Sequence, residues 1–349
     1  MAITIRLLRD DEIQLANNFF NAIYQTNRPL VNFRWEFLEG PFGKAIYVVA
    51  IDDSVTDIVK VVGIQCAIPV ELINGRGERV LSAKSEDTLV DPAYRGQKIF
   101  ERMYDLLFEA CRHAGIRYIW GFTPAKKAFE RIGFAIPFAT EQALLVLQPL
   151  AAYRYLKSLN EQNKTLDKIK ILGLSYLSWF KGLKRLFGDH LTLTETPLSD
   201  KDKAFQRHYA GQDLFTLHET TAYLTWRLGH NPFGNHYRSY QSVLGNFDAL
   251  VNSRPNVGYI EQIFAPVKSP QHSGIRSLVD ILHKQGVPLI RTFNFSSNDV
   301  LKAQGRQLSE AGFTYLKRGS YFVWKSLDDQ ERIQPSQLLI NRLFTQGNL

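Results

Sequence analysis

The chain has 349 residues, of which 45% carry apolar side chains, which suffices for two domains with globular cores and excludes a disordered chain. Lysine and arginine exceed aspartate and glutamate by 42 to 34, which gives a net charge of +8. No run of eighteen apolar residues occurs, and the first segment, MAITIRLLRDDE, lacks a signal-peptide core, so we expect a cytoplasmic protein.

The first ninety residues are predicted to form a strand, two helices and three further strands. The alternating strand ITIRLL precedes an amphipathic helix, DDEIQLANNFFNAIYQ, whose early acidic residues suit a helix N-terminus. The segment FRWEFLEGPFG then reads as a second helix followed by a turn. Three apolar segments indicate an antiparallel run of strands: IYVVAID, VKVVGIQCAIPVEL and RVLSAKSEDTLV.

The segment VDPAYRGQKIF, residues 90–100, joins the last of these strands to a helix through a cationic turn. Pro92 ends the strand because proline cannot donate a hydrogen bond to a sheet. The helix is expected to start near Gly96, and its apolar residues recur at intervals of three and four. These residues are Ile99, Met103, Leu106, Leu107 and Ala110. Free amides at the helix N-terminus, the helix dipole and the side chains of Arg95 and Lys98 predict a site for a polyanion such as a pyrophosphate.

This turn and the elements after it resemble motifs A and B of the GNAT acyltransferases, which bind acetyl-coenzyme A. The signature of motif A is Arg/Gln-x-x-Gly-x-Gly/Ala; here Arg95 and Gly96 fit, whereas Lys98 and Phe100 stand where the two signature glycines belong. Lys98 either adds an ammonium to the phosphate site or obstructs the backbone approach that glycine permits. A buried strand, IRYIWGF, then leads into the helix PAKKAFERIGF, which resembles motif B.

The resemblance implies an α/β fold with a mixed sheet through about residue 148 and a bound acetyl-coenzyme A, without a metal ion. The residues that would bind this cofactor are Leu89, Val90, Arg95, Gly96, Gln97, Lys98, Ile99 and Phe100. In the family, an acceptor amine attacks the thioester while strand amides, here near Leu89 and Val90, polarise its carbonyl.

A general base must remove the proton of the acceptor amine, and Glu86 or Asp87 would lie near the thioester. They point to opposite faces of the strand, so only one can serve. The alternative for both is a solvated strand end. Family members often carry a tyrosine before the glycine of motif B to protonate the thiolate, and here that position is Phe129.

Residues 151–190 hold eight basic and three acidic side chains, which is +5 of the net charge of +8. Within the segment KIKILGLSYLSWFKGLKRLF, apolar residues recur at helical spacing. They are Ile169, Leu172, Tyr176, Trp179, Leu183 and Leu186. Residues 151–199 are therefore predicted to be a basic amphipathic connector. Either residues 165–188 lie on a membrane surface, or the apolar face packs on the two domains. We expect no nucleic acid partner, because the basic residues lack interleaved aromatic platforms.

The chain then repeats itself, because WEFLEGPFG at Trp35 is echoed by WRLGHNPFG at Trp226. Further echoes predict a second GNAT-like copy over residues 200–330, after a first domain of residues 1–150 and before a C-terminal tail of residues 331–349. Residues 265–278, APVKSPQHSGIRSL, replace the cationic turn and lack its arginine, so one cofactor per chain is expected, in the first copy. The histidines show no metal-ligand spacing.

The sequence thus predicts two tandem GNAT-like domains that act as an acyl-coenzyme A-dependent N-acyltransferase. The donor would be acetyl-coenzyme A, and the partner a small-molecule amine such as an amino sugar. Two alternatives stay open: a tRNA-dependent aminoacyl-transferase of the peptidoglycan-bridge type, and a non-catalytic GNAT-fold protein that binds a ligand.

Overall fold

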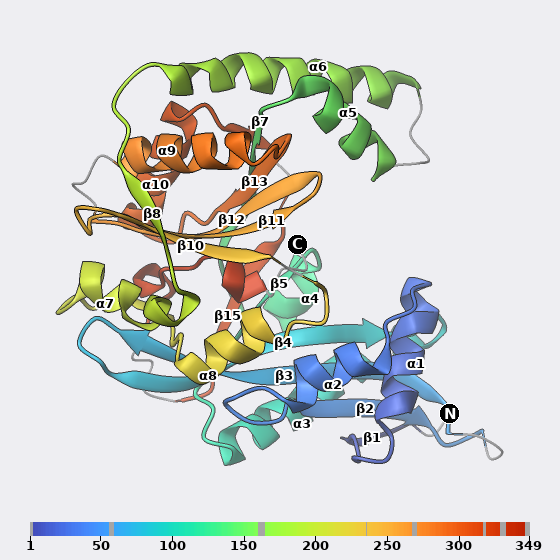
Figure 1. Cartoon of the computed structure of the whole chain (residues 1–349). Coiled ribbons are helices and arrows are strands. Elements are labelled where there is room, and N and C mark those ends of the chain that lie inside the picture. The colour runs from blue at the N-terminus through green and yellow to red at the C-terminus, as the bar shows by residue number, and fades with distance from the viewer. Residues whose placement is uncertain are drawn as a thin grey trace. The chain divides into compact units, whose positions relative to one another are not determined.

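The computed structural model describes residues 3–55, 59–159, 165–234, 236–266, 271–316, 319–328 and 333–345. The chain forms two compact units that interleave along the sequence (Figure 1). Unit 1 comprises residues 1–137, 217–233 and 321–334, and unit 2 comprises residues 138–216, 234–320 and 335–349. Each unit is built on one mixed sheet with helices on both faces, so the predicted α/β fold class is confirmed.

The sheet of unit 1 follows the strand order β1-β2-β3-β4-β5-β15-β6. Neighbours from β1 to β4 are antiparallel, β4 and β5 are parallel, and β5 and β15 are antiparallel. The strands are β1 (Ile3–Leu7), β2 (Ile46–Asp52), β3 (Val61–Asn74), β4 (Arg79–Val90), β5 (Tyr118–Thr123), β6 (Ala135–Ala139) and β15 (Tyr321–Ser326). β9 (Phe215–Leu217) ends where the chain re-enters unit 1.

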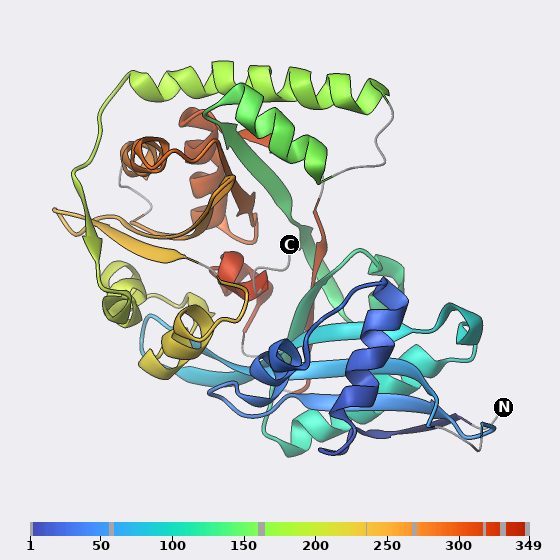
Figure 2. The same ribbon diagram turned by 45° about the vertical axis from the view of Figure 1, so that its right-hand side comes forward.

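Helices cover both faces of this sheet because its central strands are apolar on both sides. In β2, Tyr47 and Val49 pack with the helices α1 (Ile13–Tyr24) and α2 (Leu30–Leu38), and Figure 2 shows α1 crossing the near face of the sheet. The alternate residues Val48 and Ala50 pack with α3 (Ile99–His113), beside α4 (Lys126–Arg131). A strand that is buried on both faces needs this continuous apolar run.

Unit 2 repeats the arrangement with the strand order β14-β7-β13-β12-β11-β10-β8. Its strands are β7 (Glu141–Val146), β8 (Leu193–Thr196), β10 (Tyr237–Ser242), β11 (Asp248–Arg254), β12 (Val257–Phe264), β13 (Leu289–Asn294) and β14 (Thr314–Leu316). One face packs against α9 (Gln271–Lys284) and α10 (Asp299–Glu310), and the other against α5 (Pro149–Ser158) and α6 (Thr165–Gly182). The remaining short helices are η1 (Pro92–Tyr94), η2 (Leu183–Leu186), η3 (Leu198–Lys203), α7 (Ala204–Tyr209), α8 (Thr221–Leu224), η4 (Thr225–Gly229), η5 (Pro335–Gln337) and η6 (Arg342–Thr345).

The two halves of the chain exchange a strand. β15, from the second half of the chain, lies between β5 and β6, and β7, from the first half, lies between β13 and β14. The consecutive domain boundaries expected at residues 150, 200 and 330 therefore do not coincide with the compact units, which are interleaved. A strand can join a sheet wherever the neighbouring strands have unpaired backbone N–H and C=O groups. The apolar segments 141–146 and 321–326 can therefore each insert into the sheet formed mainly by the other half of the chain.

The expected connector, residues 151–199, packs against the sheet of unit 2. Leu174 and Trp179 of α6 join the apolar cluster formed by β7, β12 and β13, and the Ser178 hydroxyl lies 3.2 Å from the amide nitrogen of Val146. Among the residues that the structure describes, no helix is both long enough and apolar enough to cross a membrane.

The repeated tryptophans lie against each other in unit 1. Their rings stack with centres 5.1 Å apart at an angle of 24°. The indole N–H of Trp35 donates to the carbonyl of Trp226 at 3.0 Å, and that of Trp226 donates to the carbonyl of Trp35 at 2.9 Å. Each indole donates a hydrogen bond to the backbone carbonyl of the other tryptophan. The two repeated segments thus form a local two-fold pair. This pair attaches residues 217–233 to α2.

We expect Trp35→Ala and Trp226→Ala each to lower the free energy of unfolding of unit 1 by ~3–5 kcal/mol, because each removes a buried ring and one hydrogen bond. The loss of unfolding free energy in the double variant should be smaller than the sum of the two single losses by ~0.5–3 kcal/mol. The reason is that each single variant already removes the contact between the two tryptophans. Urea unfolding followed by circular dichroism measures this coupling. Phe233→Ala, which removes a half-exposed ring beside Trp35, is the control, and strict additivity of the tryptophan variants would contradict the account.

Candidate active site

A β-bulge interrupts β4 where the catalytic carboxylates were predicted. Cys66 pairs with Glu86 and Ile64 pairs with Leu89, so two residues of β4 oppose one residue of β3. The first of the two, Asp87, has a φ of 48°, in the left-handed region that side chains with a Cβ disfavour. The bulge turns the backbone of β4 out of its regular ladder, and the surrounding contacts must stabilise it.

Those contacts converge on the carboxylate of Asp87, whose side chain is 3% exposed. Arg28 donates to its two oxygens at 3.2 and 2.9 Å, and the hydroxyl of Tyr47 donates at 2.8 Å. Arg28 in turn donates to the side chain of Asn17 at 2.8 Å, and its guanidinium carbon lies 3.8 Å from the centre of the Phe20 ring. Burial raises the pKa of Asp87, and Arg28 and Tyr47 oppose the rise. Asp87 is therefore a fully engaged structural group.

Beyond the bulge, β4 separates from β5. The two strands pair in parallel over residues 82–84 and 118–120, and the structure describes no pairing between them beyond Lys84 and Trp120. Residues 85–90 of β4 thus form one edge of an opening in the sheet. Leu89 and Val90, the predicted partners of a thioester, lie on this edge and are partly buried.

The predicted polyanion turn follows immediately and is open to solvent at residues 95–98. Gly96 and Lys98 have φ values of 84° and 55°, which a helix cannot contain, and α3 begins at the buried Ile99. The expected helix start near Gly96 is therefore wrong by three residues. Arg95 is exposed just before the first amides of α3, and the polyanion site expected there stays a prediction.

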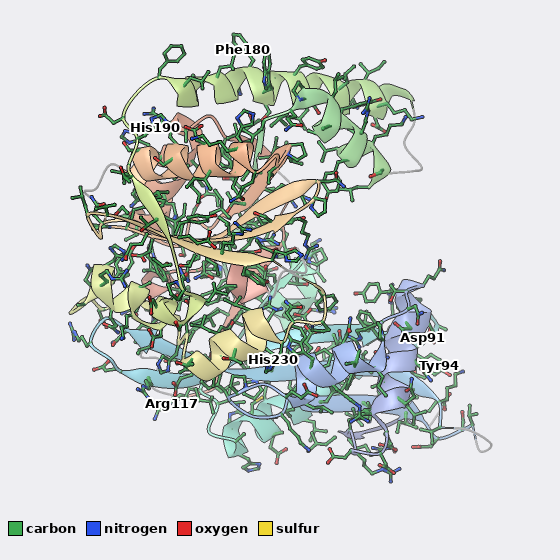
Figure 3. All side chains as sticks on the ribbon, viewed as in Figure 1. Asp91, Tyr94, Arg117, Phe180, His190 and His230 are labelled. Carbon is green, nitrogen blue, oxygen red and sulfur yellow. The ribbon has the colours of Figure 1, made fainter. Side chains whose placement is uncertain are left out.

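Lys98 occupies the left-handed conformation that glycine adopts without strain. Its side chain is exposed. The turn is anchored at its start, where the hydroxyl of Tyr94 donates to Asp52 at 2.6 Å and Asp91 accepts from the amide of Ala93 at 2.9 Å. Figure 3 labels Asp91 and Tyr94 on this side of unit 1.

The sequence analysis missed a buried carboxyl, Glu36, in the middle of α2. Its exposed fraction is 4%, and burial raises its pKa to about 7, with further increases from the charges of Glu86 and Asp87 that outweigh the opposing effects of Lys84 and Arg28. A lone glutamate beside buried aromatics in FRWEFL was the available signal. A carboxyl with a pKa near neutrality, close to other charges, is a candidate general base.

The two predicted carboxylates differ in their access to solvent. Glu86 is ion-paired with the buried Lys84, and its side chain is 27% exposed. Tyr24, a half-exposed residue at the end of α1, lies close enough to both Glu86 and Asp87 that their charges raise its pKa, after the larger effect of burial. Of the predicted pair, Glu86 is thus the more exposed to solvent.

A second missed residue is Tyr104 of α3. It is fully buried, and its hydroxyl lies 2.8 Å from that of Ser85 and 3.3 Å from that of Thr88, at the edge of the bulge. The ring of Phe129, at the family's tyrosine position, packs edge-on at 5.6 Å from the Tyr104 ring. Burial raises the pKa of Tyr104. The phenol at this opening therefore comes from α3, while Phe129 belongs to the aromatic core.

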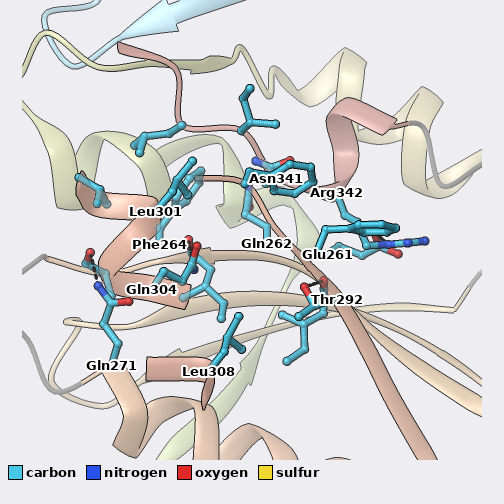
Figure 4. Close-up of a pocket in the computed structure, with 18 of the residues that line it drawn as sticks. Glu261, Gln262, Phe264, Gln271, Thr292, Leu301, Gln304, Leu308, Asn341 and Arg342 are labelled. Atoms are coloured by element: carbon cyan, nitrogen blue, oxygen red, sulfur yellow. Dashed lines mark hydrogen bonds and ion pairs between the residues drawn. The ribbon is translucent and has the colours of Figure 1, made fainter. Parts of the chain in front are cut away.

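The equivalent opening in unit 2 is occupied by the chain itself. Among the described residues, β12 pairs with β13 at Gly258 and Tyr259 and no further along the strand. Residues 339–342 of the C-terminal segment line the cavity between the two strands (Figure 4). Arg342 donates to Glu261 at 2.9 Å, and both side chains are at most 3% exposed. Displacing this segment would leave the Glu261 carboxylate buried without its ion-pair partner, which is costly. Residues 267–270, within the segment that replaces the cationic turn, lie outside the described residues.

Glu36→Gln tests the buried carboxyl through stability. Because its pKa is about 7 in the folded chain against an ordinary value of 4.5, the folded chain holds this proton more tightly, and its stability falls as pH rises from 4.5 to 7. The difference of about 2.5 in pKa corresponds to ~3 kcal/mol. The variant should be more stable than the wild type by up to that amount near pH 8 and equal to it near pH 4.

The measurement is urea unfolding across this pH range. Glu39→Gln, which neutralises an exposed carboxylate just after α2, is the matched control and should follow the wild type. Parallel curves for Glu36→Gln and the wild type would show that Glu36 does not titrate near neutrality.

Comparison with known families and structures supports the resemblance. Residues 4–136 match the acetyltransferase (GNAT) domain family. No curated protein matches the sequence. A conserved protein from Enterococcus faecalis, described as a probable N-acyltransferase, aligns over 94% of this chain and 73% of its own, with 10% identity and a TM-score of 0.60.

Two further structures cover most of both chains. A tandem GNAT protein from the clavulanic acid biosynthesis pathway aligns over 95% of this chain and 100% of its own, with 13% identity and a TM-score of 0.51. N-myristoyltransferase from Saccharomyces cerevisiae, with bound myristoyl-CoA, aligns over 92% and 82%, with 12% identity and a TM-score of 0.53. At these identities the alignments show a shared fold.

Among the described residues, no three histidine, cysteine, aspartate or glutamate side chains are grouped to hold a metal ion. The bulged strand β4 and the turn at residues 95–98 lie within the residues that match this family. Residues 4–136 match the acetyltransferase (GNAT) domain family, and the chain shares the fold of a tandem GNAT protein.

Proposed function

We propose that this protein transfers an acyl group, acetyl in the first instance, from coenzyme A to a small-molecule amine. The observation that carries the proposal is the presence in unit 1 of three features: residues 85–90 of β4 without a described partner on β5, the exposed anion turn at residues 95–98, and the buried carboxyl of Glu36, whose pKa the charge of Glu86 on β4 helps to raise. An acyl-CoA has three matching parts: a pyrophosphate, an amide-rich arm and an electrophilic thioester. One protein of similar fold holds myristoyl-CoA, which supports an acyl-CoA donor.

The anion turn would bind the pyrophosphate. The free amides at the start of α3 and the side chains of Arg95 and Lys98 supply hydrogen bonds and positive charge. The pantetheine arm would then run along residues 85–90, which have no partner on β5 among the described residues. This brings the thioester carbonyl to the amides near Leu89 and Val90, where fixed dipoles can stabilise an oxyanion.

The acceptor amine would enter beside the exposed Glu86 and Tyr24 and be held as an ammonium by the carboxylate. Glu36 would take the proton, because a base that ionises near neutrality is deprotonated in a useful fraction of molecules yet still basic. The neutral amine nitrogen then forms a bond to the thioester carbon. As the carbon–sulfur bond breaks, the electron pair leaves with sulfur, and the nitrogen loses a second proton that ends on the sulfur, so the products are an amide and the thiol of coenzyme A. The buried hydroxyl of Tyr104, which lies beside Ser85 and Thr88 of β4, would donate to the thiolate.

The first test is calorimetry with acetyl-CoA. Arg95→Glu should weaken binding by one to two orders of magnitude, roughly 1.4–3 kcal/mol, because it replaces a cation beside the pyrophosphate with an anion. Arg76→Glu, an equal charge change at an exposed position in the turn between β3 and β4, is the control and should bind normally. The wild type should bind one cofactor per chain. An affinity unaffected by Arg95→Glu, or a stoichiometry of two, would contradict the assignment.

The second test compares turnover across pH for three carboxylate variants, using a panel of amines that includes amino sugars. Wild-type turnover should rise through about pH 7, and Glu36→Gln should abolish this rise, because it removes the base. Glu86→Gln should weaken apparent affinity for the amine and keep the rise but move it to lower pH, because the negative charge of Glu86 helps to raise the pKa of Glu36. Asp87→Asn should lower both stability and turnover at every pH, because it disrupts the Arg28 contact. A rise through pH 7 that persists in Glu36→Gln would assign the base elsewhere.

A further inference from the structure

One stretch of unit 2 concentrates exposed apolar side chains. Sixteen large apolar residues are exposed in the described chain, and seven of them fall between residues 169 and 187. They are Ile169, Leu172, Tyr176, Leu177, Phe180, Leu186 and Phe187, with exposed fractions from 37% to 75%. Scattered apolar residues are normal on a protein surface, but this density in nineteen positions indicates an interaction surface.

The exposed residues follow one side of α6. Ile169, Leu172, Tyr176 and Phe180 are spaced by three and four positions, so they align along the helix. The opposite side of α6 is already used, since Ser175 and Ser178 are buried and Trp179 packs against the sheet. Figure 3 shows the ring of Phe180 pointing away from the ribbon. The sequence predicted one apolar face for this segment, and four of its residues are exposed: Ile169, Leu172, Tyr176 and Leu186. Packing of that face against the two domains therefore does not account for these four side chains.

Lysines border this apolar side. At ~100° of rotation per residue, Lys170 and Lys181 lie about a quarter turn around the helix from the apolar side. Both lie on the same flank of that side, and both are exposed. Lys184 follows in η2 and is exposed as well. The segment of residues 151–190 carries eight basic and three acidic side chains. An apolar stripe flanked by lysines is an arrangement in which long cationic side chains reach phosphate groups while apolar ones enter the acyl region.

We propose that the outward side of α6 with η2, residues 169–187, docks on an anionic lipid bilayer, with α6 lying in the plane of the membrane surface. The charge of the segment selects this occupant, because a second copy of the chain would bring an equally basic stripe against it and the like charges would repel. A bilayer of anionic lipids matches both the apolar stripe and its cationic border. This role is independent of the acyl-transfer chemistry proposed for unit 1.

Co-sedimentation with vesicles tests the proposal. The full chain should bind vesicles of mixed phosphatidylcholine and phosphatidylglycerol, bind phosphatidylcholine vesicles more weakly, and lose the difference at high salt. The double variant Leu172→Glu/Phe180→Glu should reduce binding to mixed vesicles by roughly tenfold or more, since it removes two apolar groups from the contact. Both positions are exposed, so the fold should persist, which a melting curve verifies.

The matched control is Val243→Glu/Leu244→Glu, which makes the same charge change at exposed apolar residues of the turn between β10 and β11. It should bind vesicles like the wild type. Equal loss in both double variants, or no binding of the wild type to mixed vesicles, would overturn the proposal. A wild-type dimer in vesicle-free solution that Leu172→Glu/Phe180→Glu dissociates would instead identify a second copy as the occupant.

Discussion

The site of unit 1 depends on the ion pair between Arg28 and Asp87. Asp87 has a backbone conformation that costs of order 1 kcal/mol or more for a residue with a side chain. The bulge in β4 persists because its carboxylate is fixed by Arg28, from the loop between α1 and α2, and by Tyr47 of β2. The bulge lies where β4 separates from β5, and it brings Glu86 and the amides of residues 89–90 to the opening. One buried contact thereby links the proposed acceptor side of the site to the proposed donor side.

The same topology has a different outcome in each unit. In unit 1 the strands separate beside an exposed cationic turn, whereas in unit 2 the corresponding separation is lined by residues 339–342 and sealed by the Glu261–Arg342 ion pair. The exchanged strands β7 and β15 keep the order of both sheets regular. Unit 2 can thus preserve its fold without preserving a donor site. It has instead acquired an outward apolar surface on α6.

The sequence predicted the structural features that depend on residues close to one another in the chain. The turn at residues 95–98, the helix after it and the tryptophan repeat could all be read from the order of residues. Residues that are assembled from distant segments could not. Glu36 and Arg28 gain their roles only when α1 and α2 pack against β4, and nothing in the spacing of residues 321–326 indicates insertion beside β5. The predicted start of α3 was wrong because Lys98 has a positive φ. A glycine at that position would have indicated such a conformation, whereas a lysine does not.

Hydrogen exchange of the full chain with and without acetyl-CoA tests the central claim, that the donor binds at the opened strand and turn of unit 1. It needs no knowledge of the acceptor, and it reports on each unit separately. Saturating acetyl-CoA should slow amide exchange in peptides that cover residues 85–100, and leave peptides from β12 and α9 unchanged. Protection confined to β12 and α9, or no protection anywhere at saturation, would contradict the account.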